Sequence, residues 1–187
     1  YVEIDGTPYV MELVKKMDEE NLLDADGRKK LVSQLSGYSD ALYKDALTGT
    51  YNRRYFEDEL KLQVESMAVA MFDMDDFKLC NDTYGHNAGD AALCTMVKII
   101  RKYIRKTDLL IRYGGDEFLL LMKDVTEEVF DEKLNQIQKK ISESTVPGYP
   151  NLHLSVSIGG LISSNESLER AVDRADHLMY QAKNCKN

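Results

Sequence analysis

The sequence has few cysteines, no long hydrophobic run and no excess of basic residues, and each absence excludes a class of protein. Three cysteines in 187 residues are too few and too scattered for a disulfide framework or a zinc site, which fits a reducing cytoplasm. The apolar runs are far shorter than the ~20 residues of a membrane helix, and the N-terminus lacks a secretory pattern. We expect this part of the protein to be cytoplasmic without membrane contact, although a full-length protein could be membrane-anchored.

The charge balance argues against a nucleic-acid-binding surface. Asp and Glu number 32 against 24 Lys and Arg, a formal net charge of −8, so we expect neither DNA nor RNA as a partner. The hydrophobic fraction of 43 % is ordinary for a globular chain and excludes a largely disordered one. The length suggests one domain with a short appendage.

The first 44 residues differ in pattern from the rest. Residues 1–4 and 9–15 are typical of two strands around the turn-forming residues 5–8. Because a lone hairpin is marginal in water, we interpret residues 1–17 as the remnant of an upstream sensor domain. Apolar residues at helical spacing then predict a linker helix within residues 18–44.

Helix and strand patterns alternate beyond residue 45. Apolar residues from Phe56 to Val64 indicate a helix. Four strands are predicted at residues 67–72, 109–113, 118–122 and 152–158, and further helices at residues 93–104, 130–141 and 168–179. From residue 67 the order is β-α-β-β-α-β with a final helix. This order predicts an α/β (α+β) fold of the ferredoxin-like class, with additional helices and a central, mainly antiparallel sheet.

Two acidic clusters lie where predicted strands end. Asp73, Asp75 and Asp76 follow one strand, and Asp116 and Glu117 follow two glycines in a hairpin turn. Since these strands share one sheet in this topology, the clusters could meet at one edge. Hard oxygen ligands of this kind suit Mg²⁺, which completes its shell with water and substrate phosphates. Such sites serve phosphoryl transfer. A solvated loop is the alternative interpretation of the first cluster.

Linked motifs within residues 45–183 resemble the GGDEF domains, the diguanylate cyclases of bacterial signalling. The motifs that carry the resemblance are Tyr113–Phe118, Asp45–Gly49 with Asn52–Arg54, Asp73–Lys78, Asn81–Asp82, Gly85–His86 and Gly89–Asp90. The resemblance implies a GGDEF domain at residues 45–187 with the palm fold of nucleotidyl cyclases. Residues 1–17 also resemble the last strands of a PAS sensor domain.

The resemblance implies a reaction in which two GTP molecules form cyclic di-GMP and release pyrophosphate. Each protomer of a homodimer would hold one GTP, and the 3′-hydroxyl of each nucleotide would attack the α-phosphate of the other. Asp73, the main-chain carbonyl of Met74 and Asp116 would bind Mg²⁺, or Mn²⁺ in its place. Asp116 or Glu117 would deprotonate or position the hydroxyl, and Lys78 would neutralise phosphate charge.

The implied GTP site has two guanine-reading residues, Asn81 and Asp90. A carboxylate can accept from two guanine N–H groups while an amide donates to ring acceptors, although Asp90 also suits a helix N-terminus. His86 would line the same pocket or simply pack as a neutral side chain. The full set of GTP-binding candidates is Phe77, Lys78, Asn81, His86, Asp90, Gly114, Gly115 and Lys183.

A second implied site binds the product as an inhibitor. Arg105 and Asp108 match the family's RxxD pattern, where Arg105 would hold guanine or phosphate and Asp108 a guanine edge; a polar loop is the alternative. The C-terminus departs from the family because it lacks a Gly before Lys186, which puts a phosphate contact of Lys186 in doubt. Two other functions stay open: a non-catalytic cyclic di-GMP receptor and a GTP-binding regulatory domain.

Overall fold

The computed structural model describes residues 3–4, 7–8 and 37–185, and the chain divides into two units, Tyr1–Leu42 and Tyr43–Asn187. In the first unit, β1 (Glu3–Ile4) pairs antiparallel with β2 (Thr7–Pro8). Thr7 and Pro8 therefore belong to a strand and not, as predicted, to the turn. The predicted strand at 9–15 and most of the predicted linker helix lie outside the described residues. The part of the linker that is described, residues 37–43, is helical.

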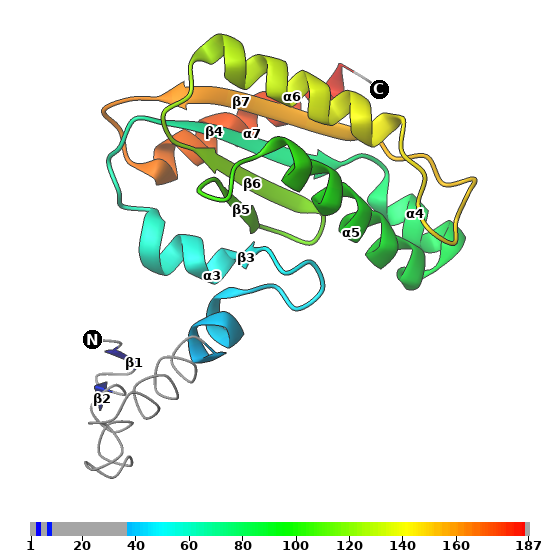
Figure 1. The fold of residues 1–187 in the computed structure, drawn as a ribbon, viewed down its shortest axis with the longest axis horizontal. Helices are drawn as coiled ribbons and strands as arrows, with labels where there is room; N and C mark the ends of the chain where they lie inside the picture. The colour runs from blue at the N-terminus through cyan, green and yellow to red at the C-terminus, as the bar shows by residue number, and fades with distance from the viewer. Residues whose placement is uncertain (1–2, 5–6, 9–36, 186–187) are drawn as a thin grey trace. The chain divides into compact units, whose positions relative to one another are not determined.

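The second unit is built on a five-stranded sheet with the order β3-β5-β6-β4-β7 (Figure 1). Its strands are β3 (Tyr51–Asn52), β4 (Met67–Met74), β5 (Leu109–Arg112), β6 (Glu117–Met122) and β7 (Val156–Ser163). Only the β3–β5 pair is parallel among these strands. The predicted α+β fold with a mainly antiparallel sheet is confirmed.

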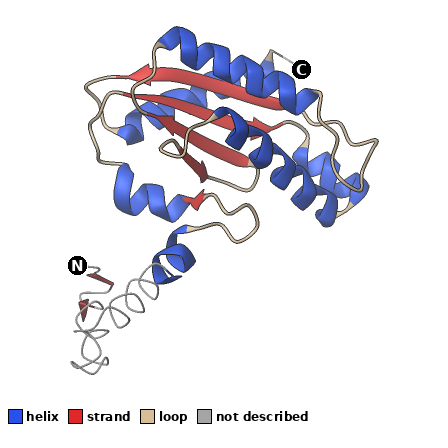
Figure 2. Ribbon diagram, viewed as in Figure 1, coloured by secondary structure: helices blue, strands red, loops and turns tan. Residues whose placement is uncertain are grey.

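Helices cover both faces of the sheet (Figure 2). They are α3 (Arg53–Tyr55), the π-helical turn η2 (Phe56–Leu60), α4 (Phe77–Tyr84), α5 (His86–Tyr103), α6 (Glu127–Ser142) and α7 (Leu168–Asn184). The buried residues of α5 and α6 pack on one face, and those of η2 and α7 pack on the other. None of the helices in the described ranges is long and apolar enough to cross a membrane.

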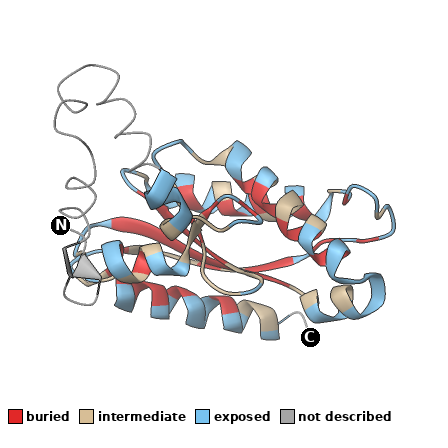
Figure 3. Cartoon of the chain, turned by 90° about the horizontal axis from the view of Figure 1, so that it is seen from below, coloured by how far each residue is buried: buried red, intermediate tan, exposed pale blue. Residues whose placement is uncertain are grey.

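Strand β4 is the centre of the core, and all its residues are buried (Figure 3). Successive side chains of a strand point to opposite faces. Ala68, Ala70 and Phe72 accordingly pack towards α5 and α6, while Val69 and Met71 pack towards α7. Because helices cover both faces, the strand has no wet side, and this explains its continuous apolar run.

Two adjacent glycines let helices approach strand β7 closely. A Cβ atom on Gly159 would clash with the main-chain nitrogen of Met179 and the carbonyl oxygen of Ala175, both in α7. A Cβ atom on Gly160 would meet Leu134 of α6 at 2.7 Å on the opposite face. The missing side chain at position 159 thus brings the backbone of α7 directly onto the sheet.

Several elements differ from the sequence-based expectation, among them β3, which was not predicted, and α5, which begins at His86. Val64 is 63 % exposed and forms an isolated bridge with Ser167, so the predicted helix ends before it. The last strand begins at Val156, although Leu152 and Leu154 before it are buried. Helix α4 gave no periodic signal because none of its side chains is fully buried.

The contact at Gly159 predicts that the variant Gly159→Ala is destabilised. Because the methyl group would clash with main-chain atoms that no rotamer change can move, we expect a loss of about 1–3 kcal/mol, the range typical of overpacking. Urea unfolding followed by circular dichroism measures this loss. The control is Gly37→Ala, whose Cβ would meet no atom within 4 Å, and an equal loss in both variants would contradict the prediction.

Candidate active site

The two acidic clusters meet at one edge of the sheet, as predicted. Asp73 on β4 lies directly opposite Glu117, the first residue of β6. The N–H of Met74 donates a 3.3 Å hydrogen bond to the main-chain oxygen of Asp116. Antiparallel pairing of β4 with β6 therefore brings Asp73 together with Asp116 and Glu117, which lie more than 40 residues further along the chain.

Burial and like charge act together on these carboxyl groups. Partial burial, followed by the charge of Asp73, raises the pKa of Asp116 above its ordinary value. The pKa of Glu117 is raised by burial first and then by the charges of Asp73, Asp176 and Asp116. Side chains with such shifts hold protons more tightly than ordinary carboxyl groups, and clusters of them are typical of functional sites.

Lys183 supplies a positive charge to this cluster from the last turn of α7. Its Nζ donates a hydrogen bond of 2.5 Å to Oδ1 of Asp73, whose residue is only 8 % exposed. Burial alone would lower the pKa of Lys183, but the hydrogen bond and charge of Asp73 raise it. Lys183 therefore lies with the acidic cluster, where a phosphate ligand is expected.

The donor set fits a magnesium ion that shares its coordination with a nucleotide. In the described part of the chain, no group of three or more His, Cys, Asp or Glu side chains could hold an ion by itself. Mg²⁺ is usually bound through one or two carboxylates together with substrate phosphates and water. The mutual repulsion that raises the pKa of Asp116 is the electrostatic reason for a cation beside Asp73.

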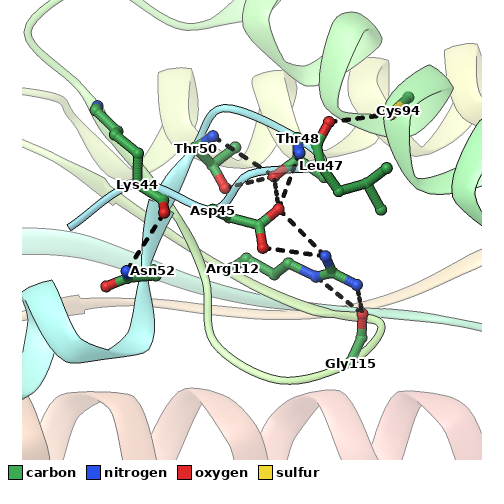
Figure 4. Close-up of polar contacts among 9 residues, drawn as sticks. All are labelled: Lys44, Asp45, Leu47, Thr48, Thr50, Asn52, Cys94, Arg112 and Gly115. Carbon is green, nitrogen blue, oxygen red and sulfur yellow. Dashed lines mark hydrogen bonds and ion pairs between the residues drawn. The ribbon is translucent and has the colours of Figure 1, made fainter. Parts of the chain in front are cut away.

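The signature turn, residues 113–116 between β5 and β6, is held in place by the side chain of Arg112, the last residue of β5 (Figure 4). The Arg112 guanidinium donates to the carbonyl oxygen of Gly115 from Nε at 3.1 Å and Nη2 at 2.7 Å. Its Nη1 contacts both carboxylate oxygens of Asp45 at 3.2 and 3.1 Å. Asp45 also accepts from the main-chain N–H and hydroxyl of Thr48. The opening motif of the domain thus positions the turn, a role that the sequence analysis did not assign.

Gly114 makes room for the side chain of Glu117 within the same turn. A Cβ atom at position 114 would clash with Oε2 of Glu117. The N–H groups of Tyr113 and Gly114 both donate to the main-chain oxygen of Glu117, at 2.9 and 3.2 Å. Gly115, by contrast, has open space around its Cα, which leaves access for a ligand.

Helices α4 and α5 carry the other predicted nucleotide-binding side chains. A Cβ atom on Gly89 would clash with the side-chain oxygen of Asn81 and would lie 3.1 Å from Cε2 of Phe77. These three residues are therefore in contact. Lys78, His86 and Asp90 are exposed on the same two helices. Within the described residues, no hydrogen bond or ion pair joins these three to the carboxylates.

Asp75, the third member of the first acidic motif, has a structural partner on the other side of β4. Its carboxylate accepts hydrogen bonds from the Ser155 hydroxyl at 2.5 Å and the Ser157 hydroxyl at 2.6 Å, and its N–H donates to the Ser155 oxygen. Asp75 therefore fixes the loop that follows β4. Serines 155 and 157, which bind it, were not predicted as part of the site.

A separate cavity of about 320 Å³ contains the predicted inhibitory residues Arg105 and Asp108. Asp108 is 8 % exposed, and one of its carboxylate oxygens accepts the main-chain N–H of Arg105 at 2.6 Å. Three further cationic residues that the sequence analysis did not assign to this site, Lys44, Arg101 and Lys106, line the same cavity. The ammonium group of Lys44 lies 3.3 Å from the ring centroid of Tyr51, a cation–π contact.

Solved structures share this fold. The GGDEF domain of DgcB from Caulobacter crescentus, determined in complex with c-di-GMP, aligns with a TM-score of 0.71 at 28 % identity, over 76 % of this chain and 91 % of that one. The diguanylate cyclase SiaD of Pseudomonas aeruginosa, determined with its activator SiaC, aligns with a TM-score of 0.73 at 29 % identity, over 95 % of this chain and 71 % of that one.

The fold is thus that of a known class of α+β domains. The family profile described as diguanylate cyclase, GGDEF domain, matches residues 42–187, so the chain belongs to the GGDEF-domain family. The diguanylate cyclase DgcM of Escherichia coli K12 is 30 % identical over 190 residues, which cover 98 % of this chain. The chain spans less than half the length of this relative, 43 %.

The raised pKa of Asp116 predicts a stabilising substitution. Because folding raises this pKa, ionisation of Asp116 lowers the stability of the folded protein at pH values above the unfolded pKa of about 3.9. We expect Asp116→Asn to raise the Tm of the metal-free protein at pH 7 by about 1–2 °C, a small effect because solvent screens a half-exposed group. The gain shrinks as the pH falls towards 4, because the carboxyl group of the folded protein takes up its proton and that of the unfolded chain begins to do so.

Thermal melts at pH 7 and at pH 4 check this expectation. The control is Asp131→Asn, at an exposed position of α6, which leaves the Tm unchanged at both pH values. A gain for Asp116→Asn that is the same at both pH values would show that its charge is not the cause.

Proposed function

We propose that this chain is a diguanylate cyclase that condenses two GTP molecules into cyclic di-GMP with release of pyrophosphate. The observation that supports the proposal most strongly is the cluster of Asp73, Asp116 and Glu117 with Lys183 at one sheet edge, in a chain of the GGDEF-domain family. Carboxylates beside an ammonium group are suited to a metal-bound triphosphate. The family name and the relatives agree with this reaction.

The proposed mechanism gives separate roles to the two acidic residues of the turn. Asp73, the carbonyl of Met74 and Asp116 would hold Mg²⁺ or Mn²⁺, and the bound ion would supply positive charge that neutralises the phosphates. Since a carboxylate that binds a cation is a weaker base, Glu117 accepts or positions the proton of the attacking 3′-hydroxyl. Its raised pKa makes it a stronger base than an ordinary glutamate. Lys78 and Lys183 neutralise charge on the phosphates.

The guanine base is proposed to bind between helices α4 and α5. Asn81 would donate to ring acceptors of guanine and Asp90 would accept from its N–H groups, with Phe77 and His86 beside them. The tight contact between Gly89 and Asn81 supports this assignment because it fixes the amide that reads the base. Adenine offers the wrong donors and acceptors, which would leave these groups unpaired. Gly114 and Gly115 allow the triphosphate to approach the turn.

Catalysis is proposed to need a homodimer, since one protomer holds one GTP and supplies half of the reaction. Residues 18–44 would act as the linker that brings two domains face to face, and residues 1–17 would belong to an upstream sensor. The compact unit that begins at Tyr43 supports a boundary near the start of the domain proposed at residues 45–187. Specific activity should therefore rise with protein concentration. A cytoplasmic location, where GTP is available, is part of this proposal.

Incubation with GTP and Mg²⁺ tests the proposed reaction. We expect cyclic di-GMP and pyrophosphate, identified by mass spectrometry after any bound nucleotide is removed. Asp116→Asn should lower kcat by at least about 100-fold, the effect typical of losing a group that stabilises transition-state charge. Asp131→Asn is the matched control and should keep the wild-type rate. No product from a dimer enforced by a fused coiled coil would refute the cyclase, and cyclic di-GMP binding by that dimer would indicate a receptor.

Product inhibition is proposed to act through the cavity that contains Arg105. Its cationic lining of Lys44, Arg101, Arg105 and Lys106 suits a cyclic dinucleotide with two phosphates. Because Asp108 holds the main chain of Arg105, truncating Asp108 would disturb the loop itself. Arg105 is therefore the cleaner position to test.

We expect Arg105→Ala to raise the concentration of cyclic di-GMP that halves the rate by about tenfold or more, since a bidentate arginine contact contributes ~1–3 kcal/mol. Initial rates at a series of added product concentrations measure this change. Lys102→Ala, at an exposed position near the end of α5, should be inhibited by the product like the wild type. An unchanged inhibition curve for Arg105→Ala would remove this cavity as the inhibitory site.

A further inference from the structure

Lys183 is bound to one carboxylate oxygen of Asp73, Oδ1. The side chain of Asp73 is 11 % exposed and that of Lys183 is 36 % exposed, and the two are joined by the 2.5 Å contact between Nζ and Oδ1. Lys183 thus lies on the solvent side of a nearly covered carboxylate. Any cation that arrives from solvent at this oxygen meets an ammonium group.

The ammonium group and a metal ion would make the same contact with Asp73. Both are positive charges that compensate a carboxylate beside other carboxylates. The described side chains cannot complete the shell of an ion without further oxygens. A bare metal ion would therefore have to displace Lys183 and would gain few protein ligands in exchange.

We propose that Lys183 is an exchangeable counter-ion, which pairs with Asp73 in the nucleotide-free protein and moves to the triphosphate when the nucleotide binds. This inference rests on the proposed function, because it needs a triphosphate at this site. The phosphates then do two things at once: they offer Lys183 a new anionic partner, and they supply the oxygens that the metal shell lacks. Binding of the metal and binding of the nucleotide are consequently coupled, so that each favours the other.

The position of Lys183 makes this exchange possible without a change in the fold. Lys183 lies in the last turn of α7, next to the end of the described chain, whereas Ala175 and Met179 anchor the same helix on β7. The anchored part of the helix stays in place while a side chain on four methylene groups swings. By reciprocity, the factor by which the nucleotide raises metal affinity equals the factor by which the metal raises nucleotide affinity.

Binding of Mn²⁺ to the nucleotide-stripped chain tests the exchange without any turnover. Electron paramagnetic resonance of free Mn²⁺ gives the Kd. We expect weak binding by the wild type and a Kd lowered at least about tenfold, or ~1.4 kcal/mol, in Lys183→Met. Lys183→Gln should behave in the same way and guards against a folding defect in one variant. Lys183→Arg keeps the charge and should stay near the wild type.

Two controls locate the effect. Lys140→Met removes a lysine from the last turn of α6 that is also paired with a carboxylate, Glu143, at 2.8 Å, and should leave the Mn²⁺ affinity unchanged. The double variant Lys183→Met with Asp73→Asn should lose the gained affinity. An affinity for Mn²⁺ equal in the wild type, Lys183→Met and Lys183→Gln would overturn the proposal.

A second measurement separates the exchange from a purely structural role. With the non-reacting analogue guanosine α,β-methylene triphosphate, the Mn²⁺ affinity of the wild type should rise strongly, and the rise should be at least about tenfold smaller in Lys183→Met. A structural role would weaken binding of both ligands without changing their coupling, and that result would refute the exchange. If the wild type forms no cyclic di-GMP but Lys183→Met still binds Mn²⁺ more tightly than the wild type, only the proposed reaction is refuted.

Discussion

The alignment of β4 with β6 is the constraint on which the site depends. Because Asp73 pairs directly with Glu117, carboxylates from distant parts of the chain are forced to one sheet edge. A shift of the register by one residue would turn these side chains to the other face. The apolar residues of β4, buried on both sides, hold the register against the repulsion between the acids. The core therefore stabilises an arrangement that is unfavourable by itself.

Two positively charged side chains stabilise this edge: one offsets the repulsion between the carboxylates, and the other positions the turn. Lys183 reaches Asp73 because Gly159 lets α7 lie against β7. Arg112 joins the turn to Asp45, so that the first motif of the domain and the signature turn form one unit. Both arrangements join segments far apart in the sequence. The site is in this sense a property of the whole domain, and the loops alone would not form it.

The basic cavity has a position of its own relative to this site. Arg105 and Asp108 lie in the loop between α5 and β5, and β5 leads directly into the signature turn. Lys44, at the end of the helical residues 37–43, lines the same cavity. A ligand in the cavity would thus contact both the entry to the domain and the segment that precedes the turn.

The sequence by itself determined the order of strands, the ferredoxin-like topology and the two acidic clusters, because apolar periodicity and turn glycines are local signals. Their meeting at one edge followed from the topology. The sequence did not reveal α4, which has no buried stripe, nor the start of the last strand, since Leu152 and Leu154 are buried outside it. Only the tertiary structure decided that Lys183 pairs with Asp73, that Arg112 holds the turn and that Lys44 lines the basic cavity. Such contacts depend on how helices pack onto a sheet, and the spacing of residues along the chain does not encode that packing directly.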